Sequence, residues 1–148
     1  MAIVDDMVCF SLYSAARATT RAYAEQLEPW GLTYPQYLVL VVLWTEGEQT
    51  VGELGRMLQL DSGTLSPLLR RMEDRQLLAR HRSGRDQRVV TVDTTEHGDA
   101  LRGELAHLPA VIAQATGLPD EASARELIDT LRRLATAMSA APPAGAPA

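Results

Sequence analysis

Cys9 is the only cysteine of the chain, and the tyrosines around it could give its thiol a chemical role. A lone cysteine usually packs as a small hydrophobic residue. Here Tyr13 follows four residues later, so on a helix its phenol lies on the same face and can donate a hydrogen bond to the sulfur. Hydrogen bonds donated to sulfur favour the thiolate, which is the nucleophilic form of cysteine. The spacing therefore indicates a reactive thiol.

Two of the other tyrosines cannot reach this thiol within one chain. Tyr23 lies fourteen residues beyond Cys9, which on one helix is roughly 21 Å at 1.5 Å per residue. Tyr34 lies still further along the sequence. If Tyr23 and Tyr34 serve a thiol at all, it must belong to a second subunit. The site would then be a property of a dimer.

The charges around Cys9 do not all act in the same direction. Asp5 and Asp6 precede it by four and three residues and would oppose a thiolate. A helix that begins close to Cys9 would favour it through the partial positive charge of the helix N-terminus. We expect the phenols to dominate, because they are predicted to be buried and in direct contact with the sulfur.

The size and composition of the chain predict one soluble globular domain. The chain has 148 residues, of which 46% are hydrophobic, without a long apolar run that could span a membrane. The N-terminus lacks a basic stretch followed by a cleavage site, so we expect no secretory signal. A single cysteine excludes an intrachain disulfide. Together these features predict a cytoplasmic protein.

The net charge of −5 conceals a strongly basic segment. Between residues 70 and 88 there are three acidic residues against seven arginines: Arg70, Arg71, Arg75, Arg80, Arg82, Arg85 and Arg88. The chain has no lysine, so every cation is a guanidinium that can make forked contacts with phosphate or guanine. A solvated face is the commoner explanation of such a cluster, but it also fits a DNA-binding surface.

Helical patterns and start signals fill the first half of the chain. Residues 4–28 carry apolar positions at helical spacing and end at a Pro-Trp-Gly break. A second helix begins at residues 33–35 and is apolar from Tyr37 to Trp44. The stretch 50–53 is a capping box before a short helix, and Asp61 or Ser62 can cap another that reaches about residue 76. The last two helices form a helix-turn-helix pattern.

The second half begins with alternating residues and ends with two helices. Segments 79–82 and 89–92 flank a turn with Gly84, which predicts a basic β-hairpin, or wing. A helix from Thr94 or Thr95 meets Pro109 and continues to Gly117, and a last helix follows Asp120. The last helix has an apolar stripe that a second copy of the chain would cover.

We therefore expect one compact, mainly α-helical domain with a small hairpin wing. Residues 1–30 and 95–139 are the expected dimerisation helices, and residues 31–94 are the winged helix-turn-helix region. Residues 140–148 contain only Ala, Pro and Gly and are predicted to be a disordered tail.

The sequence in detail resembles the MarR family of regulators and, within it, the organic hydroperoxide resistance regulators. The resemblance covers about residues 7–140. It is carried by LTYPQYL at 32–38, LDSGTLSPLL at 60–69 and DQR at 86–88, and by Cys9-Phe10 with its tyrosines. It implies a cytoplasmic homodimeric repressor, with Cys9 hydrogen-bonded by Tyr13 and by Tyr23 and Tyr34 of the partner subunit.

The resemblance also implies a redox switch. An organic hydroperoxide would oxidise the Cys9 thiolate to sulfenic acid and release the alcohol. Because there is no second cysteine, the chain matches the one-cysteine type, in which a low-molecular-weight thiol forms a mixed disulfide or the sulfur oxidises further. A bulky adduct at a close-packed dimer site would shift helices, and the pseudo-palindromic double-stranded operator would be released.

The predicted DNA contacts come from the helix that follows Asp61, which is the recognition helix, from the wing and from the second helix. Small side chains at the start of the recognition helix suit close approach to bases and phosphates. Arg70 and Arg71 are expected at phosphates, and Asp86 is expected to orient an arginine. The full set is Gln36, Ser62, Gly63, Thr64, Ser66, Arg70, Arg71, Arg82, Arg85, Asp86 and Arg88. Of these, Arg85 and Arg88 match wing positions of the family that reach the minor groove, and Gln36 is expected at the DNA backbone.

No cofactor, metal site or enzymatic activity is expected. His81, His97 and His107 lack carboxylates at ligand spacing, and no phosphate loop or nucleophile elbow is present. One alternative is a MarR-type repressor induced by a small aromatic or phenolic ligand, with Cys9 inert. Another is a thiol peroxidase that uses Cys9, which would not explain the arginines of the wing. A third is a dimeric scaffold without a DNA role.

Overall fold

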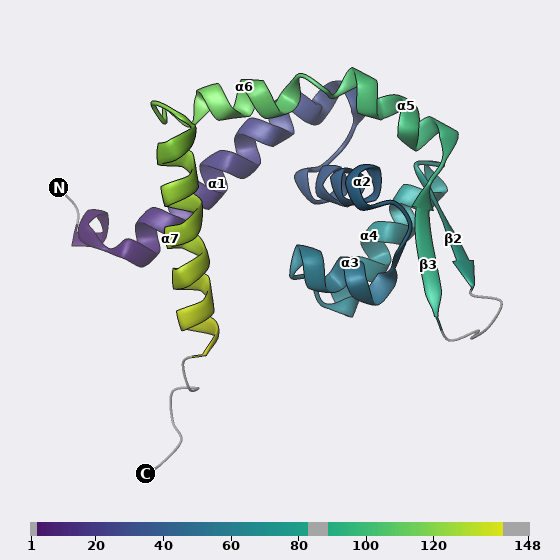
Figure 1. Ribbon diagram of the computed structural model, residues 1–148, viewed down its shortest axis with the longest axis horizontal. Coiled ribbons are helices and arrows are strands. Elements are labelled where there is room, and N and C mark those ends of the chain that lie inside the picture. The colour runs from purple at the N-terminus through teal and green to yellow at the C-terminus, as the bar shows by residue number, and fades with distance from the viewer. Residues whose placement is uncertain (1–2, 83–88, 141–148) are drawn as a thin grey trace, which may run out of the picture. The chain divides into compact units, whose positions relative to one another are not determined.

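The structure is a computed structural model that describes residues 3–82 and 89–140 (Figure 1). It consists of helices and one small antiparallel sheet, and it divides into two compact units. The first unit ends at Leu108 and contains the helix-turn-helix and the hairpin, and the second begins at Pro109. Residues 141–148 of the predicted tail, and residues 83–88 with the predicted turn, lie outside the described residues.

The N-terminal segment is one long helix between two short 3-10 turns. A 3-10 helix at Ile3–Asp6 precedes α1 at Val8–Leu27, and a second 3-10 turn follows at Glu28–Trp30. The expected helix over residues 4–28 was therefore too long at its start. Met7 has extended backbone angles (φ −90°, ψ 120°), which end the 3-10 turn and make Met7 the residue before α1.

The helices of the helix-turn-helix begin where their capping residues predict. Helix α2 spans Tyr34–Glu46, α3 spans Val51–Leu58 and α4 spans Ser62–Asp74. The capping box before α3 is confirmed, because the Thr50 amide donates to Glu53 Oε2 (2.8 Å) while the Glu53 amide donates to Thr50 Oγ1 (3.2 Å). These bonds lower the pKa of Glu53, the Thr50 amide contributing most.

The predicted hairpin is confirmed, and a short third strand joins it. Strand β2 (Leu78–Arg82) pairs antiparallel with β3 (Val90–Thr94), with Arg80 opposite Val92. Strand β1, only Gln49–Thr50, pairs with the other edge of β3, so the order is β1-β3-β2. The sequence did not predict β1, because two residues show no alternation. This strand ties the start of α3 to the wing.

A continuous leucine-rich core holds the winged helix-turn-helix together. Helix α4 buries Leu65, Leu68, Leu69 and Met72, which recur at helical spacing on one face and leave the opposite face in solvent. Figure 1 shows α3 and α4 packed beside α2, with the hairpin alongside. The core is completed by buried side chains of α2, α3, the sheet, α5 and the residues that adjoin them, among them Val39, Leu40, Leu43, Leu54, Leu77, Leu78, Val92, Leu101 and Leu105.

The last helix is confirmed after Asp120, whereas the helix predicted before it is divided in two. Helix α5 spans Glu96–Glu104, α6 spans Leu108–Ala115 and α7 spans Glu121–Ser139. The predicted continuous helix to Gly117 was wrong, because α5 ends at Glu104 and a separate helix, α6, begins at Leu108. Pro109 lies in the first turn of α6, where the backbone N–H that proline lacks would have no partner within the helix. None of the helices in the described part of the chain is long and apolar enough to span a membrane.

Candidate thiol site and DNA-binding face

Cys9 lies in the first turn of α1 and is exposed. Because α1 begins at Val8, Cys9 is its second residue, so the helix start that would favour a thiolate is present. Met7, the residue before the helix, makes no side-chain hydrogen bond to the first turn. The free amides of that turn therefore have no such cap and can face a negative charge near Cys9.

Tyr13 lies one turn beyond Cys9 on α1, as predicted, and is 55% exposed. The hydroxyl oxygen of Tyr13 accepts a hydrogen bond from Arg17 Nη1 (2.8 Å). Among the described residues, this is the hydrogen bond that the structure gives the hydroxyl, and it does not involve Cys9. The guanidinium carbon of Arg17 is also 5.4 Å from the centre of the Tyr13 ring. Because Arg17 uses only the oxygen, the phenolic proton stays available for another acceptor.

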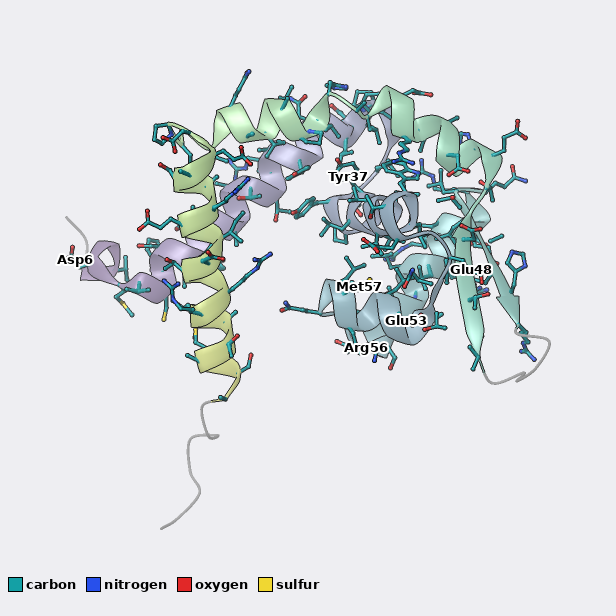
Figure 2. All side chains as sticks on the ribbon, viewed as in Figure 1. Asp6, Tyr37, Glu48, Glu53, Arg56 and Met57 are labelled. Atoms are coloured by element: carbon teal, nitrogen blue, oxygen red, sulfur yellow. The ribbon has the colours of Figure 1, made fainter. Side chains whose placement is uncertain are left out.

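Tyr23 and Tyr34 are brought together by the packing of α1 against α2. Their rings are stacked, with centroids 4.1 Å apart and planes 22° from parallel. Tyr37, also on α2 (Figure 2), is 5% exposed, and the centre of its ring lies 5.7 Å from the centre of the Tyr23 ring. No role was predicted for Tyr37 from the sequence, although its position three residues after Tyr34 places both on one side of α2.

Burial keeps these phenols protonated. It raises the pKa of Tyr23, Tyr34 and Tyr37 above the usual value, and the neighbouring phenols raise those of Tyr23 and Tyr37 further. At neutral pH the stacked pair therefore consists of hydrogen-bond donors. Both tyrosines remain far from the Cys9 of their own chain, because α1 runs unbroken between Cys9 and Tyr23, a rise of roughly 21 Å.

The start of α4 presents small polar side chains to solvent. Ser62, Gly63, Thr64 and Ser66 are all exposed. Asp61, and not Ser62, caps the helix, because its Oδ1 accepts from the Thr64 amide (2.8 Å) and its Oδ2 from the Thr64 hydroxyl (3.2 Å). These bonds lower the pKa of Asp61, the amide contributing most. Ser62 is thus not required as the helix cap.

All of the clustered arginines that the structure describes are exposed, and two of them also hold neighbouring parts of the fold. Arg75 donates to the carbonyl oxygens of Gly31 and Trp30, both at 2.7 Å. Arg80 forms an ion pair with Glu73 and lowers the pKa of that carboxyl. Arg70, Arg71 and Arg82 are exposed on α4 and β2. The predicted contacts Arg85, Asp86 and Arg88 lie outside the described residues.

A groove that the sequence did not predict lies beside the exposed start of α4. It has a volume of about 510 Å³ and joins the start of α3 to α4 and the wing. Its lining residues are Thr50, Val51, Gly52, Ser66, Arg80, Val89 and Val90. Glu53, labelled in Figure 2, caps the same end of α3. The groove adjoins the exposed start of α4 through Ser66, which lines it.

Gln36 does not have the position expected of a DNA contact. Its side chain is 6% exposed, and its Oε1 accepts a hydrogen bond from the Thr33 amide (3.0 Å) at the start of α2. The same residue type that suits a phosphate contact also completes a capping box. The structure corrects the expectation, since the buried Gln36 side chain serves to cap α2.

The fold defines a winged-helix DNA-binding protein, and comparisons with known proteins place it more closely. The family model for the transcriptional regulators SarA and Rot matches residues 21–105. The regulator TtmR of Methylorubrum extorquens is 45% identical over 86% of this chain, and the match spans 65% of the length of TtmR. The organic hydroperoxide resistance transcriptional regulator of Bacillus subtilis is 41% identical over 74% of each chain.

Solved structures agree with these sequence matches. The structure of reduced AbfR bound to DNA superposes with a TM-score of 0.72, at 34% identity, over 88% of this chain and 94% of AbfR. AbfR comes from Staphylococcus epidermidis. The chain belongs to the SarA/Rot-type family of MarR-like winged-helix transcriptional regulators. The predicted resemblance is thereby confirmed, as is the expectation of a DNA-binding regulator and not an enzyme.

Proposed function

We propose that this regulator is a homodimeric repressor that senses organic hydroperoxides through Cys9 and then releases its operator. The observation that carries the proposal is the stacked, protonated pair Tyr23–Tyr34, which is built in one chain but lies far from its own thiol. A second subunit would bring this donor pair to Cys9. The similarity to the Bacillus subtilis hydroperoxide regulator supports the same chemistry.

The proposed dimer would be formed by the N- and C-terminal helices. Val8 of α1 is 64% exposed, and Leu127, Ile128 and Leu131 of α7 are 44%, 45% and 40% exposed. All residues of α7 are described and none is buried. Apolar stripes of this kind need a cover, which a second copy of the chain supplies. Residues 1–30 and 95–139 are thus the proposed dimerisation regions.

The proposed oxidation needs no group beyond the thiol and the hydroperoxide. The Cys9 thiolate attacks the terminal oxygen of R–O–O–H, so that an S–O bond forms and the O–O bond breaks. The alkoxide takes up a proton and leaves as the alcohol. A small cellular thiol then condenses with the sulfenic acid, giving a mixed disulfide and water. Cys9 is exposed, so a hydroperoxide can reach its sulfur, and its place at a helix start favours the thiolate.

The proposed DNA contacts are the start of α4, the exposed arginines and the wing. The polar face of α4 would enter the major groove, and the partner's α4 would enter it again about 34 Å away, one turn along the duplex. An adduct at the dimer site would change that spacing and release the operator, which is a pseudo-palindrome because the dimer is symmetric. A repressor of this kind works in the cytoplasm, where the operator is.

The proposal is tested by anisotropy of labelled upstream DNA, with and without cumene hydroperoxide plus a small thiol. We expect hydroperoxide to release the unaltered protein and to leave Cys9→Ser bound, because serine cannot form a sulfenic acid. Release of both proteins would show that Cys9 is not the sensor. Retention of both would contradict the thiol switch and favour induction by a small aromatic or phenolic ligand.

Removing either stacked phenol should slow the oxidation of Cys9. Tyr23→Phe and Tyr34→Phe each delete a donor to the thiolate, so we expect oxidation roughly tenfold slower with DNA affinity unchanged. Stopped-flow oxidation followed by quenching and mass spectrometry measures the rate. Tyr37→Phe is the matched control, because it removes a phenol oxygen from the same aromatic cluster and leaves both hydroxyls of the proposed pair in place. Equal rates in all four proteins would remove the phenols from the site.

Mixed dimers decide whether the tyrosines act across the interface. One subunit carries Cys9→Ser, and the other keeps Cys9 but carries Tyr23→Phe and Tyr34→Phe. If the site is shared between subunits, the intact tyrosines of the first serve Cys9 of the second, and fast oxidation returns. If the tyrosines served their own chain, every mixed dimer would oxidise slowly.

A further inference from the structure

Arg17 contacts Tyr13 in two ways at once. Its Nη1 donates to the phenol oxygen at 2.8 Å, and its guanidinium carbon lies 5.4 Å from the ring centre. Among the ion pairs of the described residues none includes Arg17, so the interaction that the structure gives this cation is with an aromatic ring and its hydroxyl. The sequence pattern singled out the arginines at residues 70–88 and did not single out Arg17.

Helix geometry aligns this pair with the thiol. Cys9, Tyr13 and Arg17 are spaced four residues apart within α1, so they follow one another along one face. A guanidinium is planar and can stack on a ring while donating from its edge, which restricts the orientation of the phenol. A donor at the phenol oxygen also polarises the O–H bond and strengthens the hydrogen bond that this hydroxyl donates.

We propose that Arg17 is a positioning residue for the thiol, which orients the Tyr13 hydroxyl and strengthens its donation to Cys9. Arg17 acts through Tyr13 and does not itself touch the sulfur, because its position is two turns beyond Cys9, roughly 12 Å along the helix. The inference rests on the proposed function only in that Tyr13 serves Cys9. It adds a residue to the site that determines how readily the thiol reacts.

The inference is tested by a double-mutant cycle in which Cys9 is alkylated with iodoacetamide over a range of pH. This reaction reports the thiolate without requiring hydroperoxide or DNA. We expect Tyr13→Phe to slow alkylation at neutral pH about tenfold and Arg17→Gln to slow it about threefold. In both variants, the midpoint of the curve of alkylation rate against pH should shift to higher pH. In the Tyr13→Phe background, Arg17→Gln should have no further effect.

Arg21→Gln is the matched control, because it removes the same charge one turn further along α1. Within residues 3–82 and 89–140, the hydrogen bond and the cation–π contact of Tyr13 both come from Arg17 and not from Arg21. The alkylation profile of Arg21→Gln should therefore stay that of the unaltered protein. Two results would overturn the inference: an unchanged profile in Arg17→Gln, or an equal effect of Arg17→Gln with and without the Tyr13 hydroxyl, which a simple loss of charge would give.

The same variants separate this inference from the proposed function. If Arg17→Gln changes alkylation through Tyr13 but hydroperoxide does not release the unaltered protein from DNA, the positioning role stands and the redox switch fails. If hydroperoxide releases the unaltered protein while alkylation of Arg17→Gln is normal, the switch stands and the positioning role fails.

Discussion

Replacing Gly98 by alanine is expected to lower the free energy of unfolding by about 3 kcal/mol, the upper part of the usual range for overpacking. A Cβ at this position of α5 would lie 2.0 Å from the carbonyl oxygen of Leu77 and 3.1 Å from its carbonyl carbon. These are backbone atoms of a fully buried residue, and the same oxygen accepts a hydrogen bond from the Thr95 amide (3.3 Å). The overlap cannot be relieved by rotating a side chain.

Gly103→Ala is the matched control for this prediction. It lies in the same helix, is exposed, and a Cβ there would meet nothing within 4 Å. We expect it to stabilise the protein by roughly 0.5–1 kcal/mol, because alanine is the better helix former. Urea denaturation at one fixed protein concentration measures both variants. Similar stability of the two would contradict the close approach of α5 to Leu77.

The double variant Arg70→Ala, Arg71→Ala removes four arginines from the proposed homodimer. It is expected to bind operator DNA roughly 10⁴-fold more weakly at physiological salt, about tenfold for each of the four charge-assisted hydrogen bonds to phosphate that the dimer cannot form. Both side chains are exposed on α4, and neither has the structural partners that hold Arg75 and Arg80. The slope of log affinity against log salt should fall in magnitude by about 3.6, because the dimer neutralises four fewer phosphates and releases fewer counterions.

Arg102→Ala controls for the change in net charge. Arg102 is exposed on α5, outside the proposed DNA-binding face, so its removal should change neither affinity nor salt slope appreciably. Anisotropy titrations at several salt concentrations measure all variants. An unaltered slope in the double variant would exclude Arg70 and Arg71 from the interface, and a scaffold without a DNA role would show no steep salt dependence in any of them.

The fold was predictable wherever local signals determine it. Thr50 with Glu53, and Asp61 with Thr64, mark the starts of α3 and α4 by hydrogen bonds that involve neighbours only. Strand β1 and the break between α5 and α6 were not predictable in the same way. A two-residue strand exists only because β3 is available to pair with it, and that partner lies some forty residues away.

The tyrosines of the candidate thiol site were predictable from the sequence, but the residues that pack around them were less so. Tyr23 and Tyr34 were expected to act together, and the structure stacks them. The place of Tyr37 in this aromatic cluster was not predicted. Tyr37 begins an apolar run on α2, and its contact with Tyr23 of α1 depends on tertiary packing. Gln36 was misassigned because its side chain suits both a phosphate and a helix cap, and only its burial separates the two.

The central claim is that modification of Cys9 and release of DNA are one event. The most direct test follows both in a single hydroperoxide titration, with anisotropy reporting bound operator and intact-mass spectrometry reporting the state of Cys9. We expect the bound fraction to fall in proportion to the modified fraction, and both to return when a dithiol reduces the mixed disulfide. Release while Cys9 is still a free thiol, or a stable complex after complete modification of Cys9, would contradict the account.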